Sequence, residues 1–251
     1  MHSVVFADID GTLIEPVRRL TAISPGVVAA TDRVGRPVAY RTPQTDQLLR
    51  VLNAADFLIP VTGRSRSAFE RVDIPFNSFA IMHHGAMITD GAGQECSTYA
   101  AEVRDDIHRS HQVLDDAFGH AERDIAARGL PLRVYRQMLQ DRTVEVCIKH
   151  ADYRAAALDD GADAIAAYWR TLPEVRIHRN GNNLALLPDT VTKERAVRWV
   201  QDRLRVELGM MTTFGIGDST SDMGFMAVCD YWMIPGRSQI AHHIESIFRA
   251  T

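Results

Sequence analysis

Acidic residues stand at the ends of apolar segments that lie far apart in the chain. Asp8 and Asp10 follow the segment Ser3–Ala7, and Asp218 follows the segment Met211–Ile216. Two carboxylates as close in sequence as Asp8 and Asp10 repel each other unless a cation lies between them. With Asp218 they would form an all-oxygen site of the kind that suits Mg²⁺, which binds through few carboxylates and keeps several waters. The pattern therefore predicts a magnesium site, provided that the fold brings these segments together.

A hydroxyl group and an ammonium group complete a set of side chains for phosphate chemistry. Thr62 ends a third apolar segment, and Lys193 stands at the start of a predicted helix. Thr62 could donate its hydroxyl to a phosphate oxygen, and Lys193 could face developing negative charge. Of Asp8 and Asp10, one could attack phosphorus while the other carries a proton. A single aspartate at a strand end is usually a turn former, but the complete set favours phosphoryl transfer.

These side chains can meet only if the segments before them are neighbours in one sheet. Four short apolar runs bounded by turn signals are typical of buried parallel strands, at 3–7, 57–61, 79–82 and 211–216. An open parallel sheet binds its ligand at the carboxyl ends of its strands. Around this sheet we expect helices at 43–53, with Thr42 as N-cap, and at 192–208, a strand at 231–234, and a hairpin from 27–30 and 37–41.

The middle of the chain has a different pattern, in which helices alternate with paired strands. Helical periodicity covers 99–128, as one long helix or two shorter ones, and again 151–170. Strand pairs are expected at 132–139 with 143–149, and at 175–179 with 184–187, where Asn180-Gly181 is a strong hairpin signal. We therefore predict a doubly wound α/β core formed by 1–84 and 187–251, interrupted by a small α+β domain at 85–186.

Composition excludes several classes of protein. The net charge is −4 and no long basic run occurs, so the electrostatic footprint of a nucleic-acid-binding protein is absent. The three cysteines are odd in number and widely spaced, which favours buried free thiols over a disulfide framework or a zinc site. The first residues lack the charged and apolar pattern of a secretory leader, so none is expected, and no apolar run approaches the roughly 20 residues of a membrane helix. A cytoplasmic protein without a membrane partner is the expectation, and the oligomeric state is left open.

Four ordered motifs resemble those of the haloacid-dehalogenase-like phosphatases. They are Asp8-Ile9-Asp10-Gly11-Thr12-Leu13, Thr62-Gly63-Arg64, Lys193, and Gly217-Asp218-Ser219-Thr220-Ser221-Asp222. Four such motifs in this order are highly specific, and the resemblance covers about the whole chain. The insert at 85–186 resembles the C2-type cap of that superfamily, which enters at its second insertion point. Such caps are best known from sugar-phosphate phosphatases of the sucrose-phosphatase and Cof-like group.

The resemblance implies roles for the four acids. Asp8 is similar to the nucleophile, which is also a metal ligand, and Asp10 to the general acid and base, whose backbone carbonyl would bind the metal. Asp218 is similar to the metal-ligating acid of the last motif. Asp222 is similar to its second acid, which binds the metal or orients its waters and Lys193. An aspartate two residues after the nucleophile separates phosphatases from relatives that attack carbon, so Asp10 disfavours dehalogenation.

The resemblance also implies a phosphate-binding group and shows two departures from the family pattern. Thr62, Gly63 and Lys193 resemble the residues that hold the phosphate. Glu194 stands where a glycine commonly follows the lysine, and His84 stands where an asparagine is often found. The second position lies near the substrate in relatives, so this departure concerns the choice of substrate and leaves the chemistry unchanged.

Five residues are candidates for substrate contact. Arg64 follows Gly63 and would either touch substrate or brace the strand-end loop, and His84 is a candidate because of its position. Arg179, Asn182 and Asn183 belong to a polar stretch near the end of the insert, of a type that reads sugar hydroxyls; a solvated hairpin explains this stretch equally well. Adjacent histidines on a strand face opposite ways, so His83 and His84 are not expected to bind metal together.

The expected function is a Mg²⁺-dependent hydrolase of phosphomonoesters that acts through an aspartyl phosphate on Asp8. The expected substrate is a small phosphorylated metabolite, and a sugar phosphate is favoured. The insert is expected to close over the core and exclude water. A phosphomutase of the same fold, which returns the phosphoryl group to its substrate, is one alternative. A module that only binds phosphorylated ligands is another, although such a module has no need for Asp10.

Overall fold

The computed structural model describes residues 1–20, 26–152 and 155–249. The chain divides into two compact units. The first contains Met1–Tyr99 and Lys193–Thr251, and the second contains Ala100–Thr192. In the described part of the chain, no helix combines the length and the apolar character that crossing a bilayer requires.

The first unit is built on a parallel sheet with the strand order β13-β12-β1-β5. The strands are β1 (His2–Ala7), β5 (Phe57–Pro60), β12 (Met211–Ile216) and β13 (Tyr231–Met233). Their register pairs Ala7 with Pro60 on one side and with Ile216 on the other. Three neighbouring strands therefore end level with one another, so the residues that follow them emerge at one edge of the sheet.

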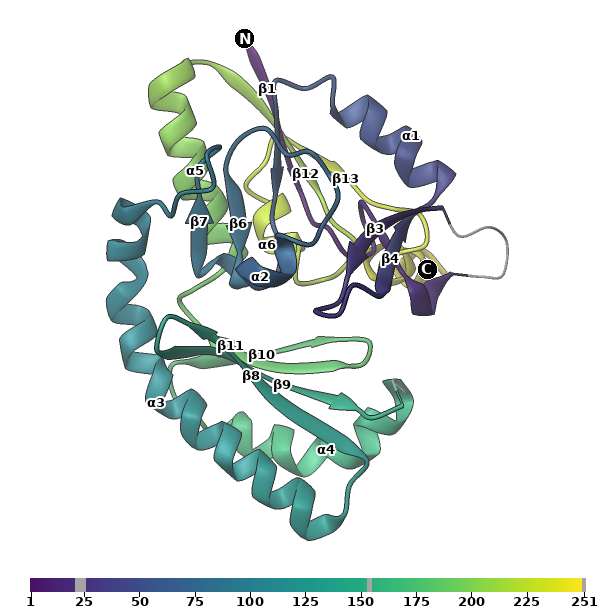
Figure 1. Ribbon diagram of the computed structural model, residues 1–251, viewed down its shortest axis with the longest axis vertical. Coiled ribbons are helices and arrows are strands. Elements are labelled where there is room, and N and C mark those ends of the chain that lie inside the picture. Colours follow the sequence, from purple (N-terminus) through teal and green to yellow (C-terminus); the bar gives the residue numbers. More distant parts are fainter. Residues whose placement is uncertain (21–25, 153–154, 250–251) are drawn as a thin grey trace. The chain divides into compact units, whose positions relative to one another are not determined.

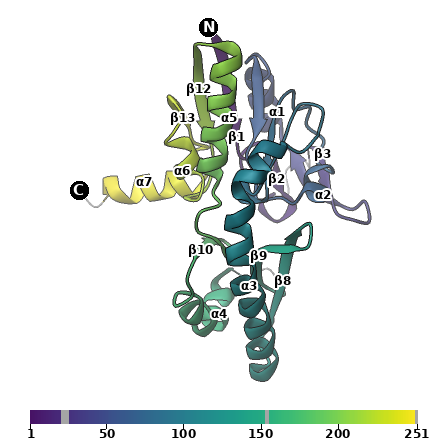
Figure 2. The ribbon, with the colours of Figure 1, turned by 90° about the vertical axis from the view of Figure 1, so that its left-hand side faces the viewer.

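Helices cover both faces of this sheet. Val5 and Ala7 of β1 share an apolar cluster with Leu49 and Leu52 of α1 (Pro43–Leu52), together with the hairpin of β3 (Val27–Thr31) and β4 (Pro37–Arg41). Helix α5 (Lys193–Leu208) lies on the other side of the sheet (Figures 1 and 2). Alternate residues of a strand point to opposite faces, and both sets in β1 are buried. The doubly wound α/β core is confirmed.

Helix α1 begins where the sequence predicted. Thr42 accepts a hydrogen bond from the backbone of Thr45, and the Thr45 hydroxyl is bonded to the Thr42 backbone in return, which forms a capping box. Pro43 occupies the first helical turn, where its missing N–H is not needed. These signals are local in the sequence, which is why the predicted start was correct.

The strand predicted at 79–82 is present, but it does not belong to the parallel sheet. It forms β6 (Ala80–Met82), which pairs antiparallel with β7 (Met87–Thr89) in a two-stranded hairpin. A single bridge between Val61 and Ile81 connects this hairpin to the end of β5. The apolar run was correctly identified as a buried strand, but so short a run gives no information about the strand that pairs with it.

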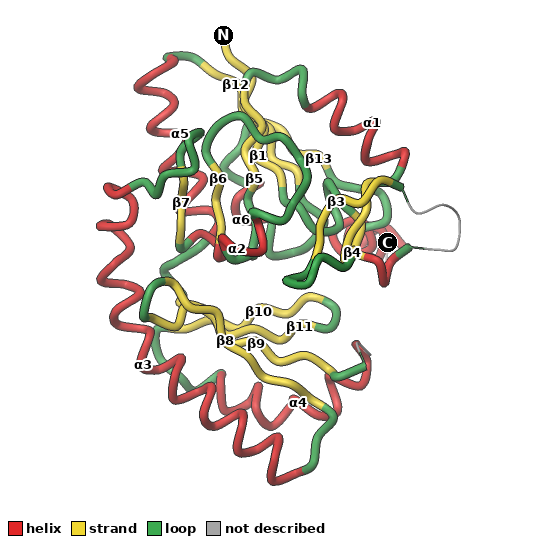
Figure 3. Tube along the Cα trace, in the orientation of Figure 1, coloured by secondary structure: helices red, strands yellow, loops and turns green. Residues whose placement is uncertain are grey.

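The second unit is a four-stranded antiparallel sheet with two helices on one face (Figures 1 and 3). The strand order is β10-β11-β9-β8, from β8 (Leu132–Leu139), β9 (Arg142–His150), β10 (Val175–Asn180) and β11 (Asn183–Pro188). A single long helix, α3 (Ser97–Arg128), and α4 (Ala155–Trp169) pack Leu114, Ile165 and Trp169 against this sheet. The α+β character predicted for the insert is therefore present.

The compact units divide at positions other than the predicted 84/85 and 186/187. Residues 85–99 belong to the first unit, because β7 pairs with β6 and the Tyr99 hydroxyl donates to the Gly85 carbonyl at 2.5 Å. Residues 187–192 belong to the second unit, because β11 continues through Leu187 to Pro188 against β10. The predicted boundaries followed the motifs, whereas the structural ones follow strand pairing.

Short elements complete the first unit. They are β2 (Glu15–Pro16), η1 (Val17–Arg19), α2 (Arg66–Phe69), η2 (His83–Gly85), α6 (Met223–Met226) and α7 (Gln239–Arg249). The three cysteines are free thiols, as predicted; Cys147 and Cys229 are buried and Cys96 is half-buried.

Candidate active site

The segment after β1 is a tight turn that separates the first two acids. The Ile9 carbonyl accepts the backbone N–H groups of Leu13 at 2.9 Å and Ile14 at 3.0 Å. Gly11 has a φ of +88°, a conformation that favours glycine. Because the chain turns here, Asp8 and Asp10 do not share one face as they would on an extended strand. Asp8 is bonded to Lys193, while Asp10 is bonded to Arg64.

Lys193 joins two of the acids. Its Nζ donates to Asp8 Oδ1 and to Asp222 Oδ1, each at 2.7 Å, and all three side chains are buried. Burial alone would lower the pKa of Lys193, but Asp222 and Asp8 outweigh it and raise this pKa. The ammonium group is therefore charged at all physiological pH values, and it stands between the residues that the motifs marked as nucleophile and metal-site acid.

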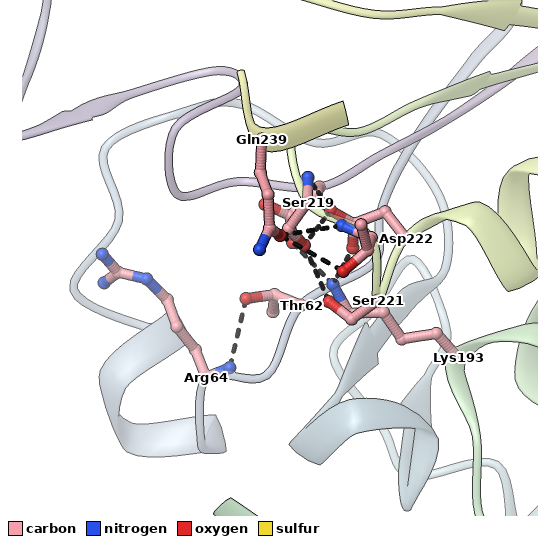
Figure 4. Close-up of polar contacts among 9 residues, drawn as sticks. Thr62, Arg64, Lys193, Ser219, Ser221, Asp222 and Gln239 are labelled. Atoms are coloured by element: carbon pink, nitrogen blue, oxygen red, sulfur yellow. Dashed lines mark hydrogen bonds and ion pairs between the residues drawn. The ribbon is translucent and has the colours of Figure 1, made fainter. Parts of the chain in front are cut away.

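Three carboxylates converge beside this lysine. One oxygen each from Asp8, Asp218 and Asp222 lie within 4.8 Å of one another. Asp222 is fixed by the backbone N–H of Ser219 at 3.0 Å and by its hydroxyl at 2.7 Å (Figure 4). Burial raises the pKa of Asp8 well above its ordinary value, Lys193 opposes this rise, and the charges of Asp222 and Asp218 add to it. A buried, all-oxygen, mutually repelling set fits a Mg²⁺ ion.

Thr62 and Gly63 follow β5 at the same edge of the sheet. The Thr62 side chain is buried, and its hydroxyl oxygen accepts the Arg64 backbone N–H at 3.1 Å (Figure 4). A hydroxyl that accepts one bond still has its proton to donate. A Cβ on Gly63 would lie 2.3 Å from Nε2 of His84, so the glycine makes room for that ring. Thr62, Gly63 and His84 are thus brought together.

Arg64 contacts Asp10. Its Nε donates to Asp10 Oδ2 at 2.7 Å and its Nη2 to Asp10 Oδ1 at 2.6 Å, so the guanidinium holds both oxygens of the carboxylate. Such two-point pairs are strong and directional. The sequence suggested two roles for Arg64, which are substrate contact and support of the strand-end loop. The structure suggests a third role, which is to orient Asp10.

Arg19 is a member of the site that sequence reasoning missed. It lies in η1, and its Nη1 donates to Asp218 Oδ2 at 2.9 Å. Glu15 is half-buried near this pair. Burial raises the pKa of Glu15, the charge of Arg19 opposes this rise, and the charge of Asp218 adds to it. Nothing in the residue types around Arg19 marks it, since its partner lies 199 positions away.

The three candidates in the insert lie in the second unit. Arg179 is an exposed residue of β10, and Asn183 pairs with Asn180 at the turn between β10 and β11. Asn182 is buried, and its side-chain amide is bonded to both the N–H and the carbonyl of His150. These bonds give Asn182 a role in holding β9 beside the turn.

Comparison with solved structures establishes the fold. No family model and no curated protein matches the sequence. The sucrose-phosphatase of Synechocystis sp. PCC6803, solved in complex with sucrose and phosphate, superposes with a TM-score of 0.55 at 14% identity, over 99% of this chain and 97% of that one. A trehalose-6-phosphate phosphatase related protein gives 0.52 at 21% identity, over 99% of each chain. A haloacid dehalogenase-like hydrolase from Bacteroides thetaiotaomicron gives 0.51 at 14% identity, over 99% of this chain and 100% of that one. The chain has the fold of the haloacid-dehalogenase-like hydrolases.

Proposed function

We propose that this protein is a Mg²⁺-dependent phosphatase that hydrolyses a small phosphomonoester through an aspartyl phosphate on Asp8. The observation that carries this proposal is the bridge of Lys193 between Asp8 and Asp222, with Asp218 beside them, at the carboxyl edge of the sheet. An ammonium group among three buried carboxylates is a costly arrangement for stability alone. It is suited to receiving a phosphoryl group.

In the first proposed step a carboxylate oxygen of Asp8 attacks phosphorus and the bond from phosphorus to the ester oxygen breaks. Asp10, oriented by Arg64, gives its proton to the leaving alkoxide, which departs as an alcohol. Thr62 and Lys193 would donate hydrogen bonds to the phosphoryl oxygens and stabilise the charge that develops on them.

In the second step Asp10 takes a proton from a water molecule, whose oxygen attacks the phosphorus of the aspartyl phosphate. The bond to Asp8 breaks, the Asp8 carboxylate is regenerated and inorganic phosphate leaves. Asp8, Asp218 and Asp222, with the Asp10 backbone carbonyl that the resemblance implies, would hold Mg²⁺. When bound, the ion would supply positive charge that neutralises phosphate and nucleophile.

The proposed substrate class is a sugar phosphate. The structural neighbours include a sucrose-phosphatase solved with sucrose and phosphate and a protein related to trehalose-6-phosphate phosphatases. We propose that the insert at 85–186 acts as the cap of this enzyme and contributes to substrate choice through Arg179 and Asn183, together with His84 of the core. Phosphomutase activity remains the enzymatic alternative, and release of free phosphate from a single substrate distinguishes the two.

The proposal is tested by phosphate release from a panel of sugar, polyol, nucleotide and amino-acid phosphates, with Mg²⁺ and with chelator. We expect release that depends on Mg²⁺ and favours sugar phosphates, and that is lost in Asp8→Asn. Asp163→Asn, at an exposed position, is the matched control and should be fully active. Tight binding of a sugar phosphate without any turnover would instead support the binding-module alternative.

A further inference from the structure

We propose that Arg19 is a built-in counterion of Asp218 that competes with the divalent cation, and thereby sets how tightly the protein binds metal. This inference rests on the proposed function, because it takes Asp218 to be a metal ligand. It concerns a residue outside the four motifs.

The contact has the geometry of a specific ion pair. Nη1 of Arg19 lies 2.9 Å from Asp218 Oδ2, and the Asp218 side chain is only 2% exposed. The Arg19 side chain is 38% exposed, so the arginine reaches the buried acid from the surface. The pair is therefore asymmetric: the arginine already reaches water, whereas the acid is enclosed by the protein and by Arg19 itself.

The absence of a side chain at Gly11 leaves room for this ion pair. A Cβ on Gly11 would lie 2.2 Å from Nη1 of Arg19 and 2.4 Å from Oδ2 of Asp218. Any side chain at this position would collide with both partners. The turn that carries the nucleophile thus leaves the space in which Arg19 meets Asp218, which is a second observation in favour of a built contact.

The charges of the neighbouring side chains show what Arg19 contributes to the site. Lys193 compensates Asp8 and Asp222, and Arg64 compensates Asp10. Arg19 supplies the cation for Asp218, whose burial raises its pKa and whose bond to Arg19 lowers it. The four aspartates and these three cations leave a formal charge of −1, and the half-buried Glu15 is a further acid near Arg19 and Asp218. Without Arg19 the formal charge of the four aspartates and two cations would be −2, and the buried Asp218 carboxylate would lack its partner, which is costly.

Metal and guanidinium cannot both be held by Asp218 without repulsion. Two positive charges a few Å apart in a partly buried site repel each other more strongly than they would in water. Because Arg19 is the partner with access to water, it is the one that we expect to leave when the cation binds. The cost of breaking the pair is subtracted from the metal affinity.

The test measures metal binding directly, by calorimetric titration with Mg²⁺ and by the spin-resonance signal of free Mn²⁺. For Arg19→Gln we expect roughly tenfold tighter binding than in the native protein. In chelator the thermal midpoint of Arg19→Gln should be lower than that of the native protein, and at saturating Mg²⁺ the two should coincide. Arg33→Gln removes the same charge from an exposed position of the same unit and should change neither quantity.

Unchanged or weaker metal binding in Arg19→Gln would overturn the inference; weaker binding would mean that Arg19 orients Asp218 as a ligand. If Arg19→Gln does not fold in chelator, Arg19→Lys, which keeps the charge with a shorter reach, should still bind metal more tightly than the native protein. The two proposals fail separately. Tighter binding in Arg19→Gln without phosphatase activity would remove the proposed function alone, whereas normal activity with unchanged affinity would remove this inference alone.

Discussion

Arg64 and Asp10 form the contact on which the proposed proton transfer depends. Asp10 lies on a turn and its side chain is 39% exposed, whereas the Arg64 side chain is 14% exposed and holds both carboxylate oxygens. An exposed carboxylate on a turn samples several orientations unless a second group restrains it. We therefore regard Arg64 as a positioning residue, and this assignment makes a prediction that differs from direct contact with substrate.

Arg64→Gln should discriminate between leaving groups. An alkyl phosphate needs a proton on its leaving oxygen, whereas p-nitrophenyl phosphate does not. If Arg64 orients Asp10, kcat/KM should fall by roughly 10²-fold for the alkyl substrate and by far less for the aryl one. Steady-state kinetics with both substrates measure this ratio, and Arg64→Lys should recover part of it. An equal loss on both substrates would show that Arg64 contacts the phosphate itself.

Lys193 should be important for stability as well as for catalysis. In Lys193→Met the buried carboxylates of Asp8 and Asp222 would face each other without the cation that bridges them. Removing one partner of a buried ion pair costs roughly 3–5 kcal/mol. We expect a large fall of the thermal midpoint in chelator, which Mg²⁺ partly reverses. Lys149→Met, the control, replaces the other lysine of the chain. A Lys193→Met protein as stable as the native one in chelator would contradict the proposed charge balance.

At the residue level, the sequence predicted those members of the site whose type and spacing are unusual. Asp8, Asp10, Thr62 and Asp218 follow strand ends, which parallel register brings together, and Lys193 stands at the start of a helix. Arg19 has no such signal, because its role depends on a turn at Gly11 and on a partner in the last motif. Contacts made by long side chains across a fold are not encoded in local patterns.

At the level of elements, local sequence signals predicted the helices and strands but not which strands pair with each other. The apolar runs of β1, β5 and β12 were recognised because strands buried on both faces are continuously apolar. The place of β6 in a hairpin was not, since its one bridge to β5 depends on the loop geometry around His83 and His84, both with positive φ. The periodicity of α3 is compatible with one long helix or two shorter ones, and the structure contains one.

The N-cap of α1 provides a test at this level. Thr42→Ala removes the side chain that accepts from the Thr45 backbone, while the buried Leu49 and Leu52 keep their positions. Loss of a threonine N-cap costs about 1 kcal/mol. Urea denaturation should show a decrease of this size, with Thr98→Ala, at an exposed position in α3, as the control. An unchanged midpoint for Thr42→Ala would mean that packing alone fixes the start of α1.

At the level of the whole molecule, a net charge of −4 means that an anionic substrate must find its positive charge locally. The first unit supplies it through Lys193, Arg64 and Arg19, each of which contacts an acid that follows a strand of the sheet. The second unit carries a different electrostatic feature. Glu145 on β9 is buried, and burial raises its pKa to about 7, although the charges of Lys149 and Arg176 oppose this rise.

Glu145 makes stability depend on pH. Its ordinary pKa of 4.5 applies in the unfolded chain and the value of about 7 in the folded one. The folded state therefore binds the extra proton, so the contribution of Glu145 is fully present below about 4.5 and is lost as the pH rises through about 7. The difference between these pKa values corresponds to roughly 3 kcal/mol.

Thermal unfolding between pH 5 and pH 8 measures this effect. The native protein should lose stability over this range relative to Glu145→Gln, and the variant should be the more stable of the two at the upper end. Glu122→Gln, which replaces an exposed glutamate of α3, should follow the native curve. Parallel curves for the native protein and Glu145→Gln would show that Glu145 is already ionised at the lower end.

The measurement that tests the central claim most directly is the capture of phosphate on Asp8. Asp10→Asn should be mixed with p-nitrophenyl phosphate and Mg²⁺, quenched in acid and digested, and its peptides analysed by mass spectrometry. The activated leaving group allows the first step without a general acid, while loss of the base slows hydrolysis of the intermediate. We predict a phosphoryl group on the peptide that contains Asp8, and no phosphoryl group in the double variant that carries Asp8→Asn and Asp10→Asn. Two results would contradict an aspartyl phosphate on Asp8, provided that the native protein turns over this substrate. One is an unmodified Asp8 peptide in Asp10→Asn, and the other is a phosphoryl group on a different residue.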